Sequence, residues 1–259
     1  MSSTKTPAER FDLTGKVAVV TGGSRGIGRA IVEAFAVAGA DVVVASRKVD
    51  RCEAVATAVT EATGRRALAV RCHVGRWEDC DALVEATYRE LGRCDVLVNN
   101  AGMSPLYPDL PSVTEEYYDK VHAVNARGPF RLAVLFGTRM SEGDGGSIVN
   151  VSTAGSLRPD PSDLPYTMAK AGLNALTLGL AAAWAPKVRV NLVMPGAFDT
   201  DIAQAWPPEQ REWAARMNPM KRMGRPDDMA GACLFLASEA SSYVNGAQIL
   251  VDGGAFRTL

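Results

Sequence analysis

The sequence predicts an α/β fold, a doubly wound and mostly parallel sheet of seven strands in one domain with helices on both faces. Short β-branched runs alternate along the chain with longer segments whose apolar residues recur at helical spacing. The runs are almost continuously apolar, which is typical of parallel strands buried on both faces. Alternation of strand and helix implies right-handed crossovers, which bring strands together in parallel.

Seven runs are expected to be strands, and the segments between them helices. The strand runs cover residues 17–20, 42–44, 67–70, 96–98, 148–151, 188–192 and 249–251. The first helical segment repeats apolar residues at helical spacing over residues 30–38, and it ends at Gly39, a residue that commonly terminates helices.

Composition narrows the class of protein. Of 259 residues, 47% are apolar and 22% charged, and neither a linker nor a repeat divides the chain. We therefore expect a polar N-terminal tail at residues 1–10 and one domain over residues 11–259. Lys and Arg number 28 against 29 Asp and Glu, so a nucleic-acid partner is not expected. No apolar run reaches the ~20 residues that span a bilayer, and no signal segment is evident, so the expected location is cytoplasmic, with no membrane contact.

Cysteine and histidine give no sign of a metal site. The five cysteines form no C-x-x-C pair, and the two histidines have no ligand-like spacing. Reduced, mostly structural thiols and no metal are expected.

Three irregular segments, residues 103–111, 157–165 and 197–219, follow the fourth, fifth and sixth expected strands. In a doubly wound sheet they gather at the carboxyl edge, where ligands bind. We expect them to form the substrate walls, with a lid at about 197–219. Their large apolar residues, which could form a pocket or simply pack the lid, are Met103, Leu106, Tyr107, Leu157, Leu164, Phe198, Ile202, Trp206 and Trp213.

A glycine-rich turn follows the first strand directly and precedes a helix. Gly22, Gly26 and Gly28 would let backbone N–H groups approach a pyrophosphate, with Ser24, Arg25 and Ile27 in the same loop. The alternative is a glycine turn that binds no ligand, and the strand–turn–helix context disfavours it.

The second strand ends in Ser46-Arg47-Lys48, where an acidic residue would bind a ribose 2′-hydroxyl. Cations suit a 2′-phosphate instead, and Arg25 can reach the same region. The sequence thus favours NADP(H) over NAD(H), although NAD(H) stays possible and a solvated basic turn is the alternative.

Tyr166 and Lys170 are four residues apart, so they share one face of the helix expected after the fifth strand. A neighbouring cation favours phenolate, which would bring the Tyr pKa closer to neutrality. The spacing alone is common on surface helices, but its position after the fifth strand favours a functional role for the pair.

Six motifs occur in the order seen in the short-chain dehydrogenase/reductase superfamily, which the chain resembles from about residue 11 to residue 255. They are the glycine loop at 21–28, Asn99-Asn100-Ala101-Gly102, Asn125, Tyr166 with Lys170, Pro195-Gly196-x₃-Thr200, and Val251-Asp252-Gly253-Gly254. Residues 46–48, 72–75 and Ser162-x₃-Tyr166 are similar to the branch of NADPH-dependent carbonyl and retinal reductases.

The resemblance implies a Rossmann fold and roles for particular residues. Tyr166 would be the general acid in reduction and base in oxidation, Lys170 would lower its pKa and bind the nicotinamide ribose, and Asn125 would hold a relay water. Asn125 could equally satisfy a backbone group freed inside a helix. The remaining positions would bind the cofactor: Asn100, Ala101, Gly102, Pro195, Gly196, Phe198 and Thr200.

Two positions depart from the family pattern. The orienting hydroxyl expected 13 residues before Tyr166 is Thr153, preceded by Ser152, and neighbours on a strand face opposite ways, so only one of them can serve. We favour Thr153. At the adenine edge, His73-Val74 stands where an Asp-Val pair is usual, and His73 is expected beside adenine rather than in catalysis.

The resulting hypothesis is an NADP(H)-dependent oxidoreductase that transfers a hydride between nicotinamide and a small carbonyl or secondary alcohol. The alternatives are a 3-oxoacyl-thioester reductase, an NAD-dependent alcohol or sugar dehydrogenase and, least favoured, a non-catalytic dinucleotide sensor. A homotetramer, or a dimer, is expected from the resemblance. The sequence does not identify the substrate.

Overall fold

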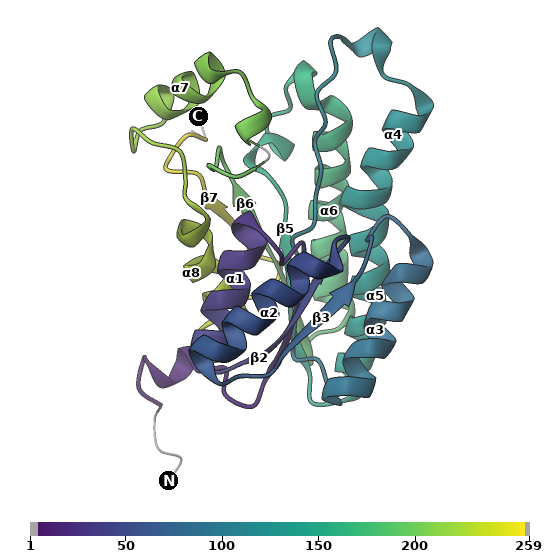
Figure 1. The fold of residues 1–259 in the computed structure, drawn as a ribbon, viewed down its shortest axis with the longest axis vertical. Coiled ribbons are helices and arrows are strands. Elements are labelled where there is room, and N and C mark those ends of the chain that lie inside the picture. Colours follow the sequence, from purple (N-terminus) through teal and green to yellow (C-terminus); the bar gives the residue numbers. More distant parts are fainter. Residues whose placement is uncertain (1–4, 202, 257–259) are drawn as a thin grey trace.

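Seven parallel strands form one sheet in the computed structural model, which describes residues 5–201 and 203–256 (Figure 1). The strand order is β3-β2-β1-β4-β5-β6-β7, so the chain reverses direction across the sheet between β1 and β4. The strands are β1 (Val17–Thr21), β2 (Asp41–Ser46), β3 (Ala67–Arg71), β4 (Val96–Asn99), β5 (Gly146–Val151), β6 (Val188–Pro195) and β7 (Gln248–Val251). All seven expected strands and the doubly wound class are confirmed, and every pairing is parallel.

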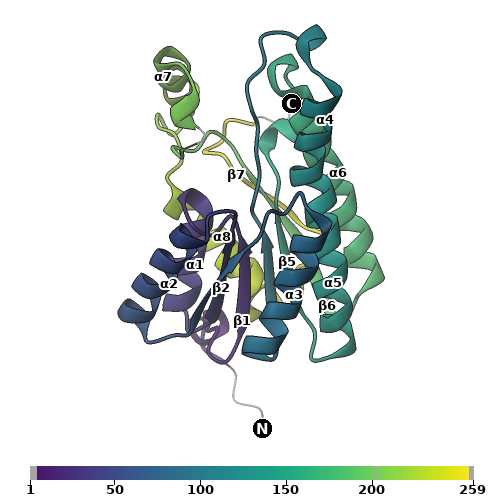
Figure 2. The same ribbon diagram turned by 45° about the vertical axis from the view of Figure 1, so that its right-hand side comes forward.

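Helices cover both faces of the sheet, as Figures 1 and 2 show. One face carries α1 (Gly26–Val37), α2 (Val49–Thr63) and α8 (Pro226–Ala237). The other carries α3 (Trp77–Leu91), α5 (Gly128–Glu142) and α6 (Leu164–Ala183), with α4 (Glu115–His122) beside α6. The short α7 (Pro208–Met217) lies beyond the carboxyl ends of the strands and contains no buried residue.

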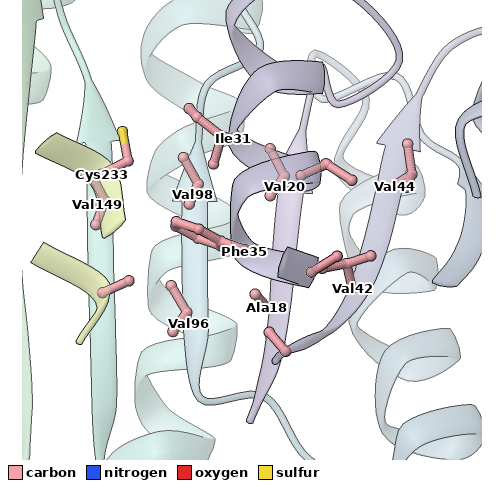
Figure 3. Packing of buried hydrophobic residues seen from close by; sticks show 14 of the residues in the cluster. Ala18, Val20, Ile31, Phe35, Val42, Val44, Val96, Val98, Val149 and Cys233 are labelled. Carbon is pink, nitrogen blue, oxygen red and sulfur yellow. The ribbon is translucent and has the colours of Figure 1, made fainter. Parts of the chain in front are cut away.

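The core consists of two apolar layers because alternate side chains of each strand point to opposite faces. Ala18 and Val20 pack under α1, whereas Val19 between them packs against the helices of the opposite face. Figure 3 shows Phe35 of α1, fully buried, among valines of β1 and β4. Burying each such side chain stabilises the fold by roughly 1.5–3 kcal/mol. A one-residue shift of a strand would move its side chains to the opposite faces, so this burial fixes the register of the strands.

A π-helical turn, residues Ala123–Arg127, joins α4 to α5. A π turn leaves backbone groups without their usual partners, and one carbonyl here is satisfied by a side chain: Asn125 Nδ2 donates to Val121 O at 2.9 Å. The turn places Asn125, completely buried, below the end of β4.

None of the helices in the described part of the chain is both long and apolar enough to cross a membrane. All five cysteines are buried as free thiols.

Candidate active site

A cavity of about 730 Å³ opens at the carboxyl edge of the sheet, at the point between β1 and β4 where the strand order reverses. Ligands of doubly wound folds bind at this position. Every residue that the sequence assigned to cofactor or catalysis lines it except Asn125, which lies beneath its floor. Further lining residues, which sequence reasoning missed, include Arg51, Cys72, Ser104, Gly155, Ser162, Asp163, Asp201 and Gln210.

The glycine loop has a backbone that other residues could not adopt. Gly22 has φ +67°, and a Cβ on Gly28 would lie 2.2 Å from Gly22 O, so both positions require glycine. No side chain caps the first turn of α1, and that turn contains no acidic residue. Its backbone N–H groups are therefore oriented as an anion-binding site that fits a pyrophosphate.

The loop after β4 is held against the glycine loop by Thr21. Thr21 Oγ1 accepts hydrogen bonds from the backbone N–H groups of Asn100 and Ala101, both at 3.1 Å. Asn100 Nδ2 in turn donates to Thr21 O at 2.8 Å. These contacts fix Asn100, Ala101 and Gly102 along the cavity wall.

Cations gather at the end of the cavity next to β2. Arg47 and Lys48 follow β2, and Arg51 comes one turn later in α2, all three exposed and lining the cavity. The spacing of Arg47 and Arg51, four residues apart at the start of a helix, is the sequence signal that could have added Arg51 to the set.

His73 lies on the wall beside these cations. Its Nδ1 accepts from Gly75 N at 3.1 Å, and burial followed by the charge of Arg47 lowers its pKa, which favours the neutral ring. The proton of that ring is then on Nε2, so His73 offers a donor where an Asp would offer an acceptor.

Arg25 points to the opposite wall. Its Nη1 donates to Asp201 Oδ2 at 2.8 Å, an ion pair between two half-exposed side chains that joins the glycine loop to the segment after β6. Thr200 lies over Gly26 at the same place. The structure thus places Arg25 apart from Arg47 and Lys48.

Tyr166 and Lys170 lie on one face of α6, as their spacing predicts. Lys170 is 2% exposed, its Nζ lies 5.9 Å from the Tyr166 ring centroid, and it donates to Val151 O at 2.7 Å. Burial lowers the pKa of Lys170 to about 8.

Burial dominates the electrostatics of Tyr166. It raises the pKa of the phenol, the charge of Asp163 raises it further, and a hydrogen bond with the Thr153 hydroxyl lowers it. Removing the phenolate from water is the largest effect, and Lys170 is not among the groups that shift the pKa of Tyr166, so the lowering expected from Lys170 is not found. Tyr166 is therefore a protonated donor at neutral pH.

Both polar atoms of the Asn125 side chain bond to the polypeptide. Besides Val121 O, its Nδ2 donates to Met103 O at 2.8 Å, and its Oδ1 accepts from Met103 N at 3.2 Å. A Cβ on Gly102 would lie 3.1 Å from Asn125 Oδ1 and 3.6 Å from Lys170 Nζ, so the two side chains converge there. Both amide hydrogens are used. Only the second lone pair of Oδ1 is left to hold a relay water.

Ser152 and Thr153 follow the end of β5 at Val151, and their hydroxyls have different partners. Ser152 is 1% exposed, and its hydroxyl donates to Asn174 Oδ1 at 2.7 Å. The Thr153 hydroxyl instead accepts from Gly155 N at 3.2 Å and bonds Tyr166.

Replacing Thr153 by Val is expected to lower kcat about 100-fold, because the hydroxyl beside the phenol is lost. Thr153→Ser retains that hydroxyl and is expected to stay within fivefold of wild type. Ser152→Ala should keep its turnover but lose about 1–2 kcal/mol of stability, since Asn174 loses a buried partner. Steady-state kinetics with thermal unfolding checks all three; turnover lost only in Ser152→Ala would reverse the assignment.

The segment after β6 forms one wall of the cavity. Phe198, Thr200 and Trp206 line it, together with Met103 and Leu106 from the loop after β4. Of the other large apolar residues predicted for the loops, Trp213 is exposed. Tyr107 does not line the cavity, and its hydroxyl donates to Pro161 O. Leu157 and Leu164 do not line the cavity either, and Ile202 lies outside the described residues.

This segment is anchored at both ends. At its start, a Cβ on Gly196 would lie 2.8 Å from Asp252 Cβ. At its end, Asn218 Nδ2 donates to Asp252 O at 2.8 Å. The turn at Asp252 therefore supports the substrate wall, in agreement with a structural role for this motif.

No group of three or more His, Cys, Asp or Glu side chains gathers as metal ligands would within residues 5–201 and 203–256.

A glycine cradle, a cationic nucleotide end and a Tyr beside a buried Lys on a doubly wound sheet together define a dinucleotide-binding oxidoreductase. A family model described as "Enoyl-(Acyl carrier protein) reductase" matches residues 22–255. The human "Dehydrogenase/reductase SDR family member 4" is 36% identical over 248 residues, covering 95% of this chain and 89% of that protein. The chain belongs to the short-chain dehydrogenase/reductase family.

Solved structures agree with this assignment. A gluconate 5-dehydrogenase from Burkholderia cenocepacia J2315, in complex with NADP and tartrate, is 30% identical with a TM-score of 0.92, covering 98% of this chain and 100% of that one. A 7α-hydroxysteroid dehydrogenase complexed with NADH and a 7-oxo bile acid is 31% identical, again with a TM-score of 0.92 and the same coverage. Relatives of one fold are thus found with either cofactor.

Proposed function

We propose that the protein is an NADP(H)-dependent carbonyl reductase that transfers a hydride between nicotinamide and a carbonyl or secondary alcohol. The observation that carries the proposal is one continuous cavity with Arg47, Lys48 and Arg51 at one end and Tyr166 beside Thr153 and Lys170 at the other. The alignment of one relative with NADP and another with NADH leaves the cofactor preference to the residues of this chain.

The residues present fit the dinucleotide. The cradle that a Cβ on Gly22 or Gly28 would fill, together with the free N–H groups of α1, suits the pyrophosphate. Arg47, Lys48 and Arg51 would hold the 2′-phosphate through charge-assisted hydrogen bonds. When bound, NADP(H) supplies the hydride.

The protein supplies the proton and the orientation of the substrate. Tyr166 Oη, protonated at neutral pH, would donate to the substrate oxygen in reduction, while Thr153 Oγ1 orients that oxygen. Lys170, next to the ring and buried, stabilises the phenolate that remains. A phenol that is protonated at neutral pH is in the state that proton donation in reduction requires.

The reaction class is tested by oxidation of NADPH, followed by the absorbance of the reduced nicotinamide, with a panel of α-diketones, retinal, acetoacetyl thioesters and sugars. Turnover of simple ketones or diketones supports the proposal. Turnover confined to the thioesters would replace it with the 3-oxoacyl-thioester alternative.

Arg47→Asp is expected to reverse the cofactor preference. The substitution removes a charge-assisted contact with the 2′-phosphate and adds a repulsive charge, while an Asp can accept from a ribose hydroxyl. The ratio of kcat/KM for NADPH over NADH should fall at least 100-fold. Arg89→Asp, at an exposed position of α3 away from the cavity, is the matched control. Equal kcat/KM for both cofactors in the wild type would contradict the NADP(H) assignment.

The segment at residues 197–219 is proposed as the substrate lid, with its ends held at Asp252. The homotetramer or dimer expected from the family resemblance stays a prediction.

A further inference from the structure

Asp163 is a carboxylate in the substrate half of the cavity, and one of its oxygens has no hydrogen-bond partner among the described residues. It precedes α6 directly, at the N-cap, yet its side chain makes no capping hydrogen bond. An Asp at this position usually accepts from the backbone N–H groups of the first turn. The nearby Asp160 behaves in the usual way, since its Oδ1 accepts from Ser162 N at 2.9 Å and from Ser162 Oγ at 2.7 Å.

The two oxygens of Asp163 have different surroundings. Oδ1 is fully buried and has no hydrogen-bond partner among the described residues. The side chain lines the cavity and is half-buried, so the carboxyl group is open to the cavity through its other oxygen. A buried and unpaired acceptor costs about 1–3 kcal/mol, a cost that a bound donor or cation would offset. Burial, and then the charge of Asp160, raises the pKa of Asp163, while a hydrogen bond from the Asp160 backbone lowers it in part.

The charges of the cavity are distributed unevenly. Arg47, Lys48 and Arg51 lie at the nucleotide end. The carboxylates of the described cavity lining are Asp163 and Asp201, and Asp201 is paired with Arg25. The ammonium of Lys170 also lines the cavity, but it is buried and directed at the backbone. Asp163 therefore gives the substrate half a negative charge that has no ion-pair partner among the described residues.

The other walls of this half suit an alkyl cation. Met103, Leu106 and Trp206 provide apolar and aromatic surface. A carboxylate near an indole ring is a common combination for alkylammonium groups, since the ring face attracts cations as well. A carboxylate substrate would be repelled by Asp163, and the only ammonium among the described residues of this half, that of Lys170, is already bonded to Val151 O.

We propose that Asp163 is a specificity-determining residue that selects carbonyl substrates carrying a positively charged nitrogen and disfavours those carrying a carboxylate. The inference rests on the proposed carbonyl reductase function and names its substrate class. Asp163 directly precedes α6, Tyr166 lies in the first turn of that helix, and both line the cavity. We therefore expect the nitrogen to lie close to the reacting carbonyl, as in a small amino ketone.

The experiment compares ketones of nearly equal shape and different charge. Trimethyl(oxopropyl)ammonium carries a permanent cation, methyl neopentyl ketone is its neutral carbon counterpart, and levulinate is anionic. Wild type should show a kcat/KM ratio of cationic over neutral ketone that falls at least tenfold in Asp163→Asn, and levulinate should improve in the same variant. Comparing ratios cancels the intrinsic reactivity of each ketone. Glu61→Gln, which removes an exposed carboxylate on α2, should leave all three values unchanged.

A ratio unchanged within twofold in Asp163→Asn would overturn the inference. Calorimetric affinity of the cationic ketone for the protein, with and without NADP⁺, gives an arm that needs no turnover. If wild type reduces neither ketone, the proposed function fails, and calorimetry still decides the role of Asp163. Tenfold weaker binding in the variant then supports the role, and equal binding refutes it.

Discussion

Tyr166→Phe is expected to lower kcat for ketone reduction by about 10²–10⁴-fold, the usual contribution of a positioned proton donor. The phenol is the only group at the substrate end that is protonated at neutral pH, bonded to Thr153 and beside the buried Lys170, within the described residues. The ring itself is retained in the variant, so packing on α6 changes little. Affinity for NADPH should stay within about threefold, because the glycine cradle and Arg47 are untouched.

The measurement pairs steady-state turnover with titration of NADPH fluorescence. Tyr243→Phe removes a hydroxyl from a fully exposed tyrosine and serves as the control, with wild-type values expected throughout. Turnover in Tyr166→Phe within fivefold of wild type would show that another group, or water, delivers the proton. Loss of NADPH affinity together with turnover would assign Tyr166 to binding instead.

The fold was predictable because its signals are local in the sequence. Continuous apolar runs fix the strands, and the turn from Gly22 to Gly28 has a conformation that only glycine allows. The π turn around Asn125 was not predictable, since it depends on Met103 of another loop accepting and donating to the same amide. Such long-range contacts leave no spacing pattern in the chain.

The candidate site divides in the same way. Tyr166 and Lys170 share a helix face, so their spacing reveals them. The choice of Thr153 over Ser152 followed from its spacing of 13 residues before Tyr166, which resembles the family pattern. The partner of Ser152, Asn174, only appears once α6 is packed on β5. Asp163 gave no signal, because an Asp before a helix is ordinarily a cap. Its lack of a cap bond is a fact of packing.

The direction of the Tyr166 pKa shows where sequence reasoning was incomplete. The spacing of Tyr166 and Lys170 indicates a cation near a phenol, which lowers the pKa of the phenol. In the structure the pKa of Tyr166 is instead raised, first by desolvation of the phenolate and then by the charge of Asp163. Burial is a property of the folded chain, so the balance was decided by packing.

Lys170→Met is expected to lower kcat at least 100-fold while making the protein more stable at pH 7. Activity falls because the positive charge near the Tyr166 ring is lost. Stability rises because burial depresses the pKa of Lys170 from 10.5 to about 8. A shift of this size means that burying the ammonium lowers the free energy of unfolding by roughly 3 kcal/mol at neutral pH. The lost hydrogen bond to Val151 O costs about 1 kcal/mol, so the net change still favours the variant.

The pH dependence separates this explanation from simple repacking. Between about pH 8 and pH 10.5 the unfolded wild-type chain holds a proton on Lys170 that the native state has released. The free energy of unfolding of the wild type must therefore rise with pH across that window relative to the variant, and the two should converge near its upper end. Lys187→Met is the matched control, since Lys187 Nζ also donates to a backbone carbonyl, Gly143 O at 2.8 Å, but at the surface. Denaturant unfolding of the three proteins across this pH range measures the differences in the free energy of unfolding. If Lys170→Met were less stable than wild type at pH 7, the buried ammonium would stabilise the native state, and the explanation would be wrong.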